Sequence, residues 1–159
     1  MKRIAIFPGS FDPITKGHEN ILLRALPLFD EIIIAVGVNS AKKSFFTLEQ
    51  RTNWIKQVFE NEPKVRVETY TGLTINFCKK VGANFILRGL RTATDFEFEN
   101  LIGQNNKVMA PEIESIFMIP ISELSAINST VVRDIIRNGG NPTPFVPTSI
   151  NVSEMTPSA

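Results

Sequence analysis

Cysteine and histidine are nearly absent from this chain of 159 residues, in which Cys78 and His18 are the only examples. A single cysteine excludes an internal disulfide, and the two residues together supply too few ligands for a structural zinc site. We therefore expect a protein of the reducing cytoplasm without a dedicated metal site.

The chain also lacks an excess of charge of either sign, with 17 Lys and Arg against 16 Asp and Glu. Without a polybasic field, it has none of the electrostatic attraction typical of proteins that bind nucleic acids or anionic membranes. We expect neither as a partner, and we expect any anionic ligand to meet a local cluster of donors.

Long apolar runs are missing as well. The longest, Ile32 to Val38, has the length of a strand rather than of a membrane span. The apolar stretch near Met1 stops at Pro8, far short of the core of a signal peptide. The sequence therefore predicts a soluble chain that is not processed at its start.

The pattern that is present is an alternation of strands and helices. Apolar or β-branched runs predict strands at Ile4 to Phe7, Ile32 to Val38, Val65 to Val67, Ala83 to Leu87 and Ile116 to Ile119. Apolar residues at helical spacing predict helices within Ile21 to Phe29, Leu48 to Phe59, Ile75 to Val81, Asp95 to Val108 and Ser129 to Asn138. The alternation favours a single-domain α/β fold with a doubly wound, mostly parallel sheet, whose ligands bind at the carboxyl ends of the strands.

The last part of the chain has a different composition. Residues 141–159 contain four prolines among Ser and Thr, and we expect a partly ordered tail with one short helical turn near Ser149. Residues 1–140 are then assigned to the folded domain.

A glycine-containing turn joins the first strand to the first helix and spans Gly9 to His18. Backbone N–H groups and the positive end of the helix dipole make such a turn a ready anion site, and His18 would point its ring at the same anion. Taken singly, the glycines could serve the turn alone, and a lone histidine is more often structural. The dinucleotide-binding alternative is weak because the spacing G-x-G-x-x-G is absent.

Two further segments carry phosphate-binding residue types. Arg88 and Arg91 follow a predicted strand, where forked guanidinium groups could clamp phosphates. Ser129 and Thr130 open the last predicted helix, where hydroxyls and free N–H groups suit a triphosphate, although for this segment taken alone an ordinary N-cap is the favoured explanation.

These segments resemble two signatures of the nucleotidyltransferase superfamily. Thr15 to His18 is similar to its T-x-G-H form, and Ile127 to Arg133 is similar to I-S-S-T-x-x-R. Within the superfamily, three segments resemble the S-K-K, R-G-L-R and D-F-E-x-E stretches of phosphopantetheine adenylyltransferases: Ser40 to Lys43, Arg88 to Arg91 and Asp95 to Glu99. The resemblance runs without gaps from about Arg3 to Pro147 and implies the Rossmann-like fold of that superfamily.

The chain departs from the family pattern at four positions. Ser10 stands for a frequent Thr and Asn128 for a Ser, and both keep their hydrogen-bonding capacity. Leu124 and Ala126 stand where relatives often carry an aromatic residue, which predicts a looser contact with adenine.

The resemblance implies an enzyme that transfers the adenylyl group of ATP to 4'-phosphopantetheine, giving dephospho-coenzyme A and pyrophosphate in coenzyme A biosynthesis. It also implies Mg²⁺ bound with ATP and a homohexamer. A phosphate monoester has a second pKa near about 6, so the attacking phosphate is already mostly a dianion and needs no general base.

By the same resemblance, site residues fall into three groups. The catalytic residues would be His18, Lys42, Arg91 and Ser10. ATP would be bound by Gly9, Ser10, Phe11, His18, Gly89, Leu90, Arg91, Glu99, Leu124, Ser125, Ala126, Ile127, Asn128, Ser129 and Thr130. The acceptor would be bound by Ser10, Lys42, Leu73, Thr74 and Arg88.

Two alternatives stay open at this point. The acceptor could be another phosphate, such as nicotinamide mononucleotide, or the donor could be CTP. The chain could also be a nucleotide sensor without turnover, although a sensor has no need of both signatures.

Overall fold

The structure is a computed structural model that describes residues 2–39 and 41–158, so that Ser40, the first residue of the segment that resembles S-K-K, lies outside the described residues. Five strands form one sheet in the order β3-β2-β1-β4-β5, and every neighbouring pair is parallel. The strands are β1 (Ile4–Gly9), β2 (Glu31–Gly37), β3 (Val65–Tyr70), β4 (Phe85–Gly89) and β5 (Glu114–Met118). The predicted doubly wound α/β fold is confirmed.

The register of the sheet aligns the carboxyl ends of its strands. Gly9 of β1 lies opposite Val36 of β2, and Gly89 of β4 lies opposite Met118 of β5. Because the strands are parallel, the segments that follow them emerge at one edge of the sheet. These are the segments in which the sequence predicts phosphate-binding residues.

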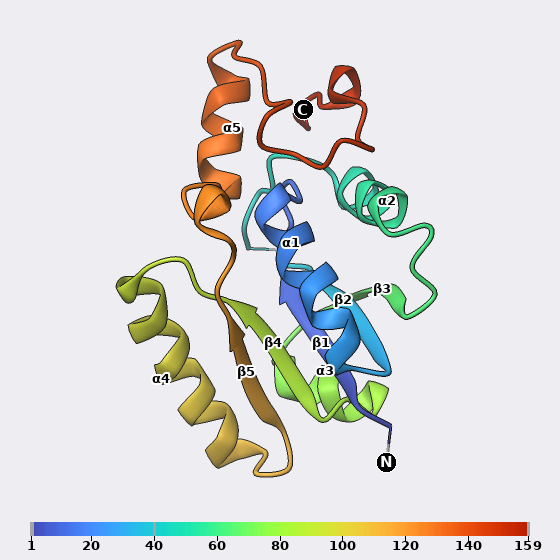
Figure 1. Ribbon diagram of the computed structural model, residues 1–159, viewed down its shortest axis with the longest axis vertical. Helices are drawn as coiled ribbons and strands as arrows, with labels where there is room; N and C mark the ends of the chain where they lie inside the picture. Colours follow the sequence, from blue (N-terminus) through green and yellow to red (C-terminus); the bar gives the residue numbers. More distant parts are fainter. Residues whose placement is uncertain (1, 40, 159) are drawn as a thin grey trace.

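Within the described residues five helices accompany the sheet, and α5 lies beyond the carboxyl ends of the strands (Figure 1). They are α1 (Lys16–Ala25), α2 (Leu48–Val58), α3 (Thr74–Val81), α4 (Ala93–Met109) and α5 (Ser129–Arg137), with short 3-10 turns η1 (Leu26–Leu28), η2 (Ser122–Leu124) and η3 (Val152–Glu154). Buried side chains of α1, α2 and α5 share one apolar cluster with β1 and β2, and those of α3 share a second cluster on the opposite face. The sheet is therefore buried on both faces, which explains its unbroken apolar strands.

Several predicted boundaries are wrong by a few residues. The first helix was expected to run to Phe29 but ends at Ala25, because Pro27 cannot donate to the helix and the chain turns into η1. The third strand continues to Tyr70, beyond the predicted Val67. Helix α4 begins at Ala93, where the Thr92 side chain accepts a hydrogen bond from the N–H of Asp95 and caps it.

The C-terminal segment packs on the domain. Val146, Ile150 and Met155 are buried in the same apolar cluster as β1 and α1, and the N–H of Lys16 donates to the carbonyl of Phe145 at 3.0 Å. The helical turn expected near Ser149 lies instead at Val152–Glu154. The domain boundary at residue 140 stays a prediction. Residues 141–158 contribute buried side chains to the apolar core of the domain.

Candidate active site

His18 is held in place by the residue that caps its own helix. Thr15 is the N-cap of α1, and His18 is the third residue of the helix. The Thr15 hydroxyl accepts from the N–H of His18 at 3.5 Å, while the N–H of Thr15 donates to Nδ1 of His18 at 3.0 Å. This is a capping box in which the imidazole replaces the usual Glu or Gln, and it explains the spacing T-x-G-H.

The capping box also sets the protonation of the ring. Since Nδ1 accepts a hydrogen bond from a backbone N–H, the proton of the neutral imidazole lies on Nε2. Burial, together with the positive charges of Arg91 and Arg88, lowers the pKa of His18 to about 4. The ring is therefore neutral near pH 7 and offers one N–H donor from Nε2.

The turn before α1 is fixed from several sides. Arg51 of α2 donates to the Ser10 carbonyl at 2.6 Å, and Arg133 of α5 donates to the Asp12 carbonyl at 2.7 Å. Phe11 has a φ of 46°, in the left-handed region, and its buried ring packs at 5.0 Å from the imidazole of His18. The strain of such a backbone persists only where surrounding contacts enforce it.

Ser129 makes a contact that the sequence did not indicate. Its hydroxyl donates to the Pro13 carbonyl at 2.8 Å, so it ties the start of α5 to the turn. The cap of α5 is Asn128, whose side chain accepts from the N–H of Val131 at 2.9 Å. The second signature thus contacts the turn that leads into the first.

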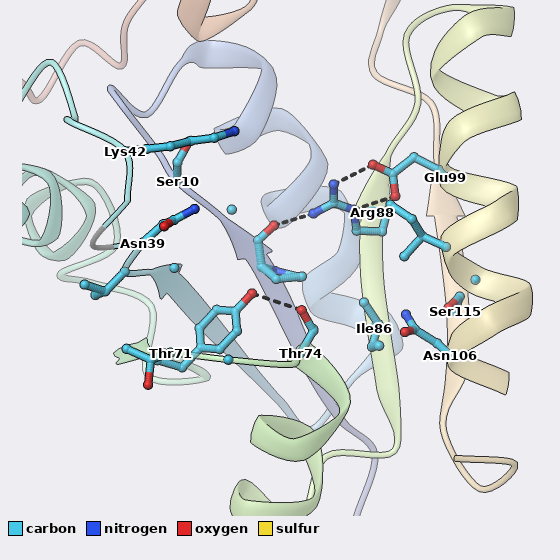
Figure 2. A pocket seen from close by; sticks show the side chains of 18 of the residues that line it. Ser10, Asn39, Lys42, Thr71, Thr74, Ile86, Arg88, Glu99, Asn106 and Ser115 are labelled. Atoms are coloured by element: carbon cyan, nitrogen blue, oxygen red, sulfur yellow. Dashed lines mark hydrogen bonds and ion pairs between the residues drawn. The ribbon is translucent and has the colours of Figure 1, made fainter. Parts of the chain in front are cut away.

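Arg88 lies between the sheet and α4. It forms a forked ion pair with Glu99, in which Nε donates to Oε2 at 2.8 Å and the terminal Nη2 reaches Oε1, and its Nη1 donates to the Pro8 carbonyl at 2.6 Å. Glu99 is buried. Figure 2 shows these bonds holding the guanidinium in the middle of the site.

Two cavities meet at this arginine. The larger cavity has a volume of about 800 Å³ and extends from the end of β2 along α4, with Lys42, Tyr70, Thr74 and Asn106 among its lining residues. In Figure 2, the ammonium group of Lys42 extends over Ser10 toward the centre of the larger cavity.

The smaller cavity, of about 370 Å³, lies over the N-termini of α1 and α5. His18, Gly89 and Arg91 line it together with Ile127 to Thr130. The two cavities share five lining residues, which are Pro8, Gly9, Ser10, Arg88 and Glu99. A ligand in one cavity therefore lies next to a ligand in the other, across the carboxyl end of β1.

Comparison with known proteins identifies the family. Residues 6–135 match the family model described as cytidylyltransferase-like. The phosphopantetheine adenylyltransferase of Flavobacterium psychrophilum is 55% identical over 150 residues, which cover 94% of this chain and 99% of the relative. The enzyme of the same name from Christiangramia forsetii is 58% identical over 137 residues, covering 86% of this chain and 90% of the relative.

The chain belongs to the phosphopantetheine adenylyltransferase family. The resemblance drawn from its two signatures is thereby confirmed, and so is its class as an adenylyltransferase.

Solved structures agree with the fold. A nicotinate-nucleotide adenylyltransferase candidate from Vibrio parahaemolyticus superimposes with a TM-score of 0.70 at 19% identity, covering 98% of this chain and 91% of that one. At this identity the likeness supports the nucleotidyltransferase fold alone.

The structure brings together most of the residues that the family resemblance implied. Of the fifteen positions expected to bind ATP, those outside the lining of the smaller cavity are Leu90, Leu124, Ser125 and Ala126. The carbonyl oxygen of Leu124 nevertheless lies beside Gly17, 3.8 Å from the position that a Cβ on Gly17 would occupy. Of the acceptor residues, Leu73 lies outside the lining of the larger cavity and is 54% exposed.

The sequence missed several residues of the larger cavity in this family member. Tyr70 donates to or accepts from the Thr74 hydroxyl at 3.0 Å, and its ring stacks on Phe77. Asn106 reaches the same space from α4. For Tyr70 the only available signal was its position at the end of a strand, at the carboxyl edge of the sheet. For Asn106, which lies in a polar helix, the sequence offered no signal.

Carboxylates near the cavities are engaged by cations. Glu99 pairs with Arg88, and Asp95 pairs with Arg91 at 3.1 Å. Among residues 2–39 and 41–158, no three His, Cys, Asp or Glu are grouped so that they could hold a metal ion. Over the same residues, no helix is long and apolar enough to cross a membrane.

Proposed function

We infer that this chain transfers the adenylyl group of ATP to 4'-phosphopantetheine, giving dephospho-coenzyme A and pyrophosphate. The observation that carries this conclusion is the meeting of two cavities at Ser10 and Arg88, since adenylyl transfer requires two phosphorylated ligands side by side. The family membership and the name shared by its relatives support the same reaction.

We propose that ATP occupies the smaller cavity. Two helix N-termini, those of α1 and α5, face it, and each offers a positive dipole end to the phosphates. Arg91 adds a cation at the carboxyl end of β4. Mg²⁺ would enter on the phosphates of ATP as part of the substrate, because the nearby carboxylates are paired with arginines.

The acceptor belongs in the larger cavity. Lys42 and Arg88 come from the ends of two strands and supply an ammonium group and a guanidinium for a phosphate dianion. The cavity continues past Thr74 toward Ile102 and Asn106 on α4, which gives room for an extended arm with amide groups. A polar and partly apolar channel of this kind suits a pantetheine chain.

The reaction is a direct substitution at phosphorus. An oxygen of the acceptor phosphate attacks the α-phosphorus of ATP, the bond from that phosphorus to the bridging oxygen breaks, and pyrophosphate leaves with the bonding electron pair. The nucleophile is already a dianion, so no residue has to remove a proton. Catalysis then depends on alignment and on stabilising charge on the α-phosphoryl oxygens.

His18 is the residue we assign to that charge. The capping box fixes its ring, which leaves Nε2–H as the donor, and His18 lines the smaller cavity. A neutral donor of this kind stabilises a developing anion without binding the ground-state phosphates strongly. Lys42, Ser10 and Arg91 would assist it from the two cavities.

We also propose a homohexamer in the cytoplasm. Helix α4 carries an exposed apolar surface that includes Phe96, Phe98, Leu101 and Val108, the last of which is 82% exposed. Exposed apolar surface of this extent is typical of protein interfaces. Light scattering with mass determination tests the assembly, and a monomer at micromolar concentration would contradict it.

The reaction is tested by measuring pyrophosphate release with candidate pairs of donor and acceptor. ATP with 4'-phosphopantetheine should give pyrophosphate and dephospho-coenzyme A in equal amounts. Release with nicotinamide mononucleotide, or with CTP as donor, in place of this pair would indicate the alternative acceptor or donor. Binding of ATP without release for any acceptor would indicate a sensor.

A further inference from the structure

The C-terminal segment crosses the outside of the loop that carries Lys42. We define the C-terminal strap as residues 141–158. In Figure 1 this red segment lies beside α2, close to the loop that enters this helix. That loop joins β2 to α2 and contains Lys42, which lines the larger cavity.

The end of the strap is hydrogen-bonded to the loop. The N–H of Ser158 donates to the carbonyl of Phe45 at 2.8 Å. The Ser158 hydroxyl lies 3.0 Å from the carbonyl of Ser44 and 2.9 Å from that of Phe45. One residue of the strap thus reaches two consecutive carbonyls of the loop, two and three positions after Lys42.

The strap is itself anchored. Gln50 of α2 donates to the Thr156 carbonyl at 3.0 Å, and the side chains of Ile150 and Met155 are buried in the main apolar cluster. Ser158 is therefore presented from a fixed support rather than from a free end.

The loop is also held on its inner side. The two carboxylate oxygens of Asp12 accept from the N–H groups of Phe45 and Phe46, at 2.8 Å each. Phe46 is fully buried and packs edge-on against Trp54, with 4.8 Å between ring centroids. Phe45 is therefore bonded inward to Asp12, in the turn before α1, and outward to the strap.

We propose that Ser158 is a positioning residue for Lys42. By fixing the far end of the loop, the strap keeps the ammonium group over Ser10, where it meets the acceptor phosphate. A Lys42 side chain that is held in place before binding loses little conformational entropy when the acceptor binds. Removing the contacts of the strap should therefore weaken acceptor binding. The proposal rests on the proposed function, because it takes Lys42 as a ligand of the acceptor.

The test compares three changes in the strap by steady-state kinetics, with each substrate varied in turn. A chain that ends at Thr156 loses all the Ser158 bonds, Ser158→Ala loses only the hydroxyl, and Ser158→Thr keeps it. Loss of one or two hydrogen bonds should raise the KM for 4'-phosphopantetheine about three- to tenfold, with the KM for ATP changed by less than about twofold. Ser158→Thr should behave like the unchanged chain.

Ser153→Ala is the matched control within the strap. Its hydroxyl bonds only to Asn151, inside the strap itself. Both kinetic constants should remain unchanged in this variant. If it raises the acceptor KM as much as Ser158→Ala does, the strap acts through general stability and the proposal is overturned.

The same changes made in a Lys42→Ala background distinguish a failure of the strap proposal from a failure of the proposed function. If the strap acts through Lys42, shortening the chain adds no further rise in acceptor KM to that of Lys42→Ala. An additive rise overturns the positioning role. If Lys42→Ala alone leaves the acceptor KM unchanged, the assignment of Lys42 in the proposed function fails instead, and the strap proposal fails with it.

Discussion

The backbone N–H of Thr15 donates to Nδ1 of His18 at 3.0 Å, so the imidazole is oriented by the first residue of its own motif. The spacing of three residues is that of a helix capping box, in which each end of the motif satisfies the backbone of the other. Local secondary structure thus determines which nitrogen of the imidazole is left as the N–H donor.

We predict that His18→Ala lowers kcat about a hundredfold to a thousandfold while the KM for ATP changes little. The donor acts on charge that develops in the transition state, and loss of one such donor has an effect of this size. Calorimetric titration of ATP into the variant checks that binding is retained. A kcat close to that of the unchanged chain would remove His18 from the mechanism.

The capping box predicts a difference between two threonines. Thr15 and Thr47 are N-caps of α1 and α2, and both take part in capping boxes. Thr15→Val and Thr47→Val should each lower the free energy of unfolding by about 1 kcal/mol. Only Thr15→Val should lower kcat markedly, because only Thr15 has a hydroxyl that lies 3.0 Å from Nδ1 of His18 and helps to orient the imidazole. Denaturant unfolding and turnover are measured on both variants, and equal turnover would refute the orienting role.

His18 should titrate far below the usual histidine range. Its pKa is lowered to about 4 by burial and by Arg91 and Arg88. The unfolded chain, with a histidine pKa near 6.5, therefore binds more protons than the folded chain between about pH 4 and 6.5. The contribution of this group to stability is present in full above about pH 6.5 and is lost as the pH falls toward about 4.

Because the chain has one histidine, proton NMR reports this titration without assignment. Arg91→Ala should raise the pKa of His18 toward the usual value, since a positive charge is removed. Arg137→Ala, which removes a cation that lies over the Phe45 ring, is the control and should leave the titration unchanged. A midpoint near 6.5 in the unchanged chain would contradict the buried neutral ring.

Glu99 and Asp95 should affect different substrates. Glu99→Gln weakens the forked pair that holds Arg88, and we expect the KM for 4'-phosphopantetheine to rise about three- to tenfold. Asp95→Asn frees Arg91 in the smaller cavity and should change the KM for ATP instead. Steady-state kinetics on both variants, with each substrate varied in turn, tests this difference. The reversed pattern would mean that ATP occupies the larger cavity and the acceptor the smaller one.

The sequence predicted what depends on periodicity and on strand ends. The five strands, the turn at Gly9 and the arginines at the carboxyl end of β4 follow from apolar runs and from the position of residues at their ends. The sequence did not predict the pairing of Arg88 with Glu99, because eleven positions separate them and only the packing of α4 brings them together.

The burial of the C-terminal segment was also not predictable from the sequence. Val146, Ile150 and Met155 are isolated apolar residues among Pro, Ser and Thr, with neither helical nor strand periodicity. Nothing in such a pattern indicates burial, which arises only once α1 and α2 provide a surface for it. A tertiary contact, rather than local propensity, orders this segment.

Transfer of the adenylyl group to the acceptor phosphate is tested most directly by following the oxygen atoms of that phosphate. 4'-Phosphopantetheine labelled with ¹⁸O in its phosphate is turned over with ATP, and both products are analysed by mass spectrometry. Attack by this phosphate on the α-phosphorus predicts that dephospho-coenzyme A keeps all the label and pyrophosphate carries none. Label in pyrophosphate, or no dephospho-coenzyme A at all, would contradict the mechanism assigned to the two cavities.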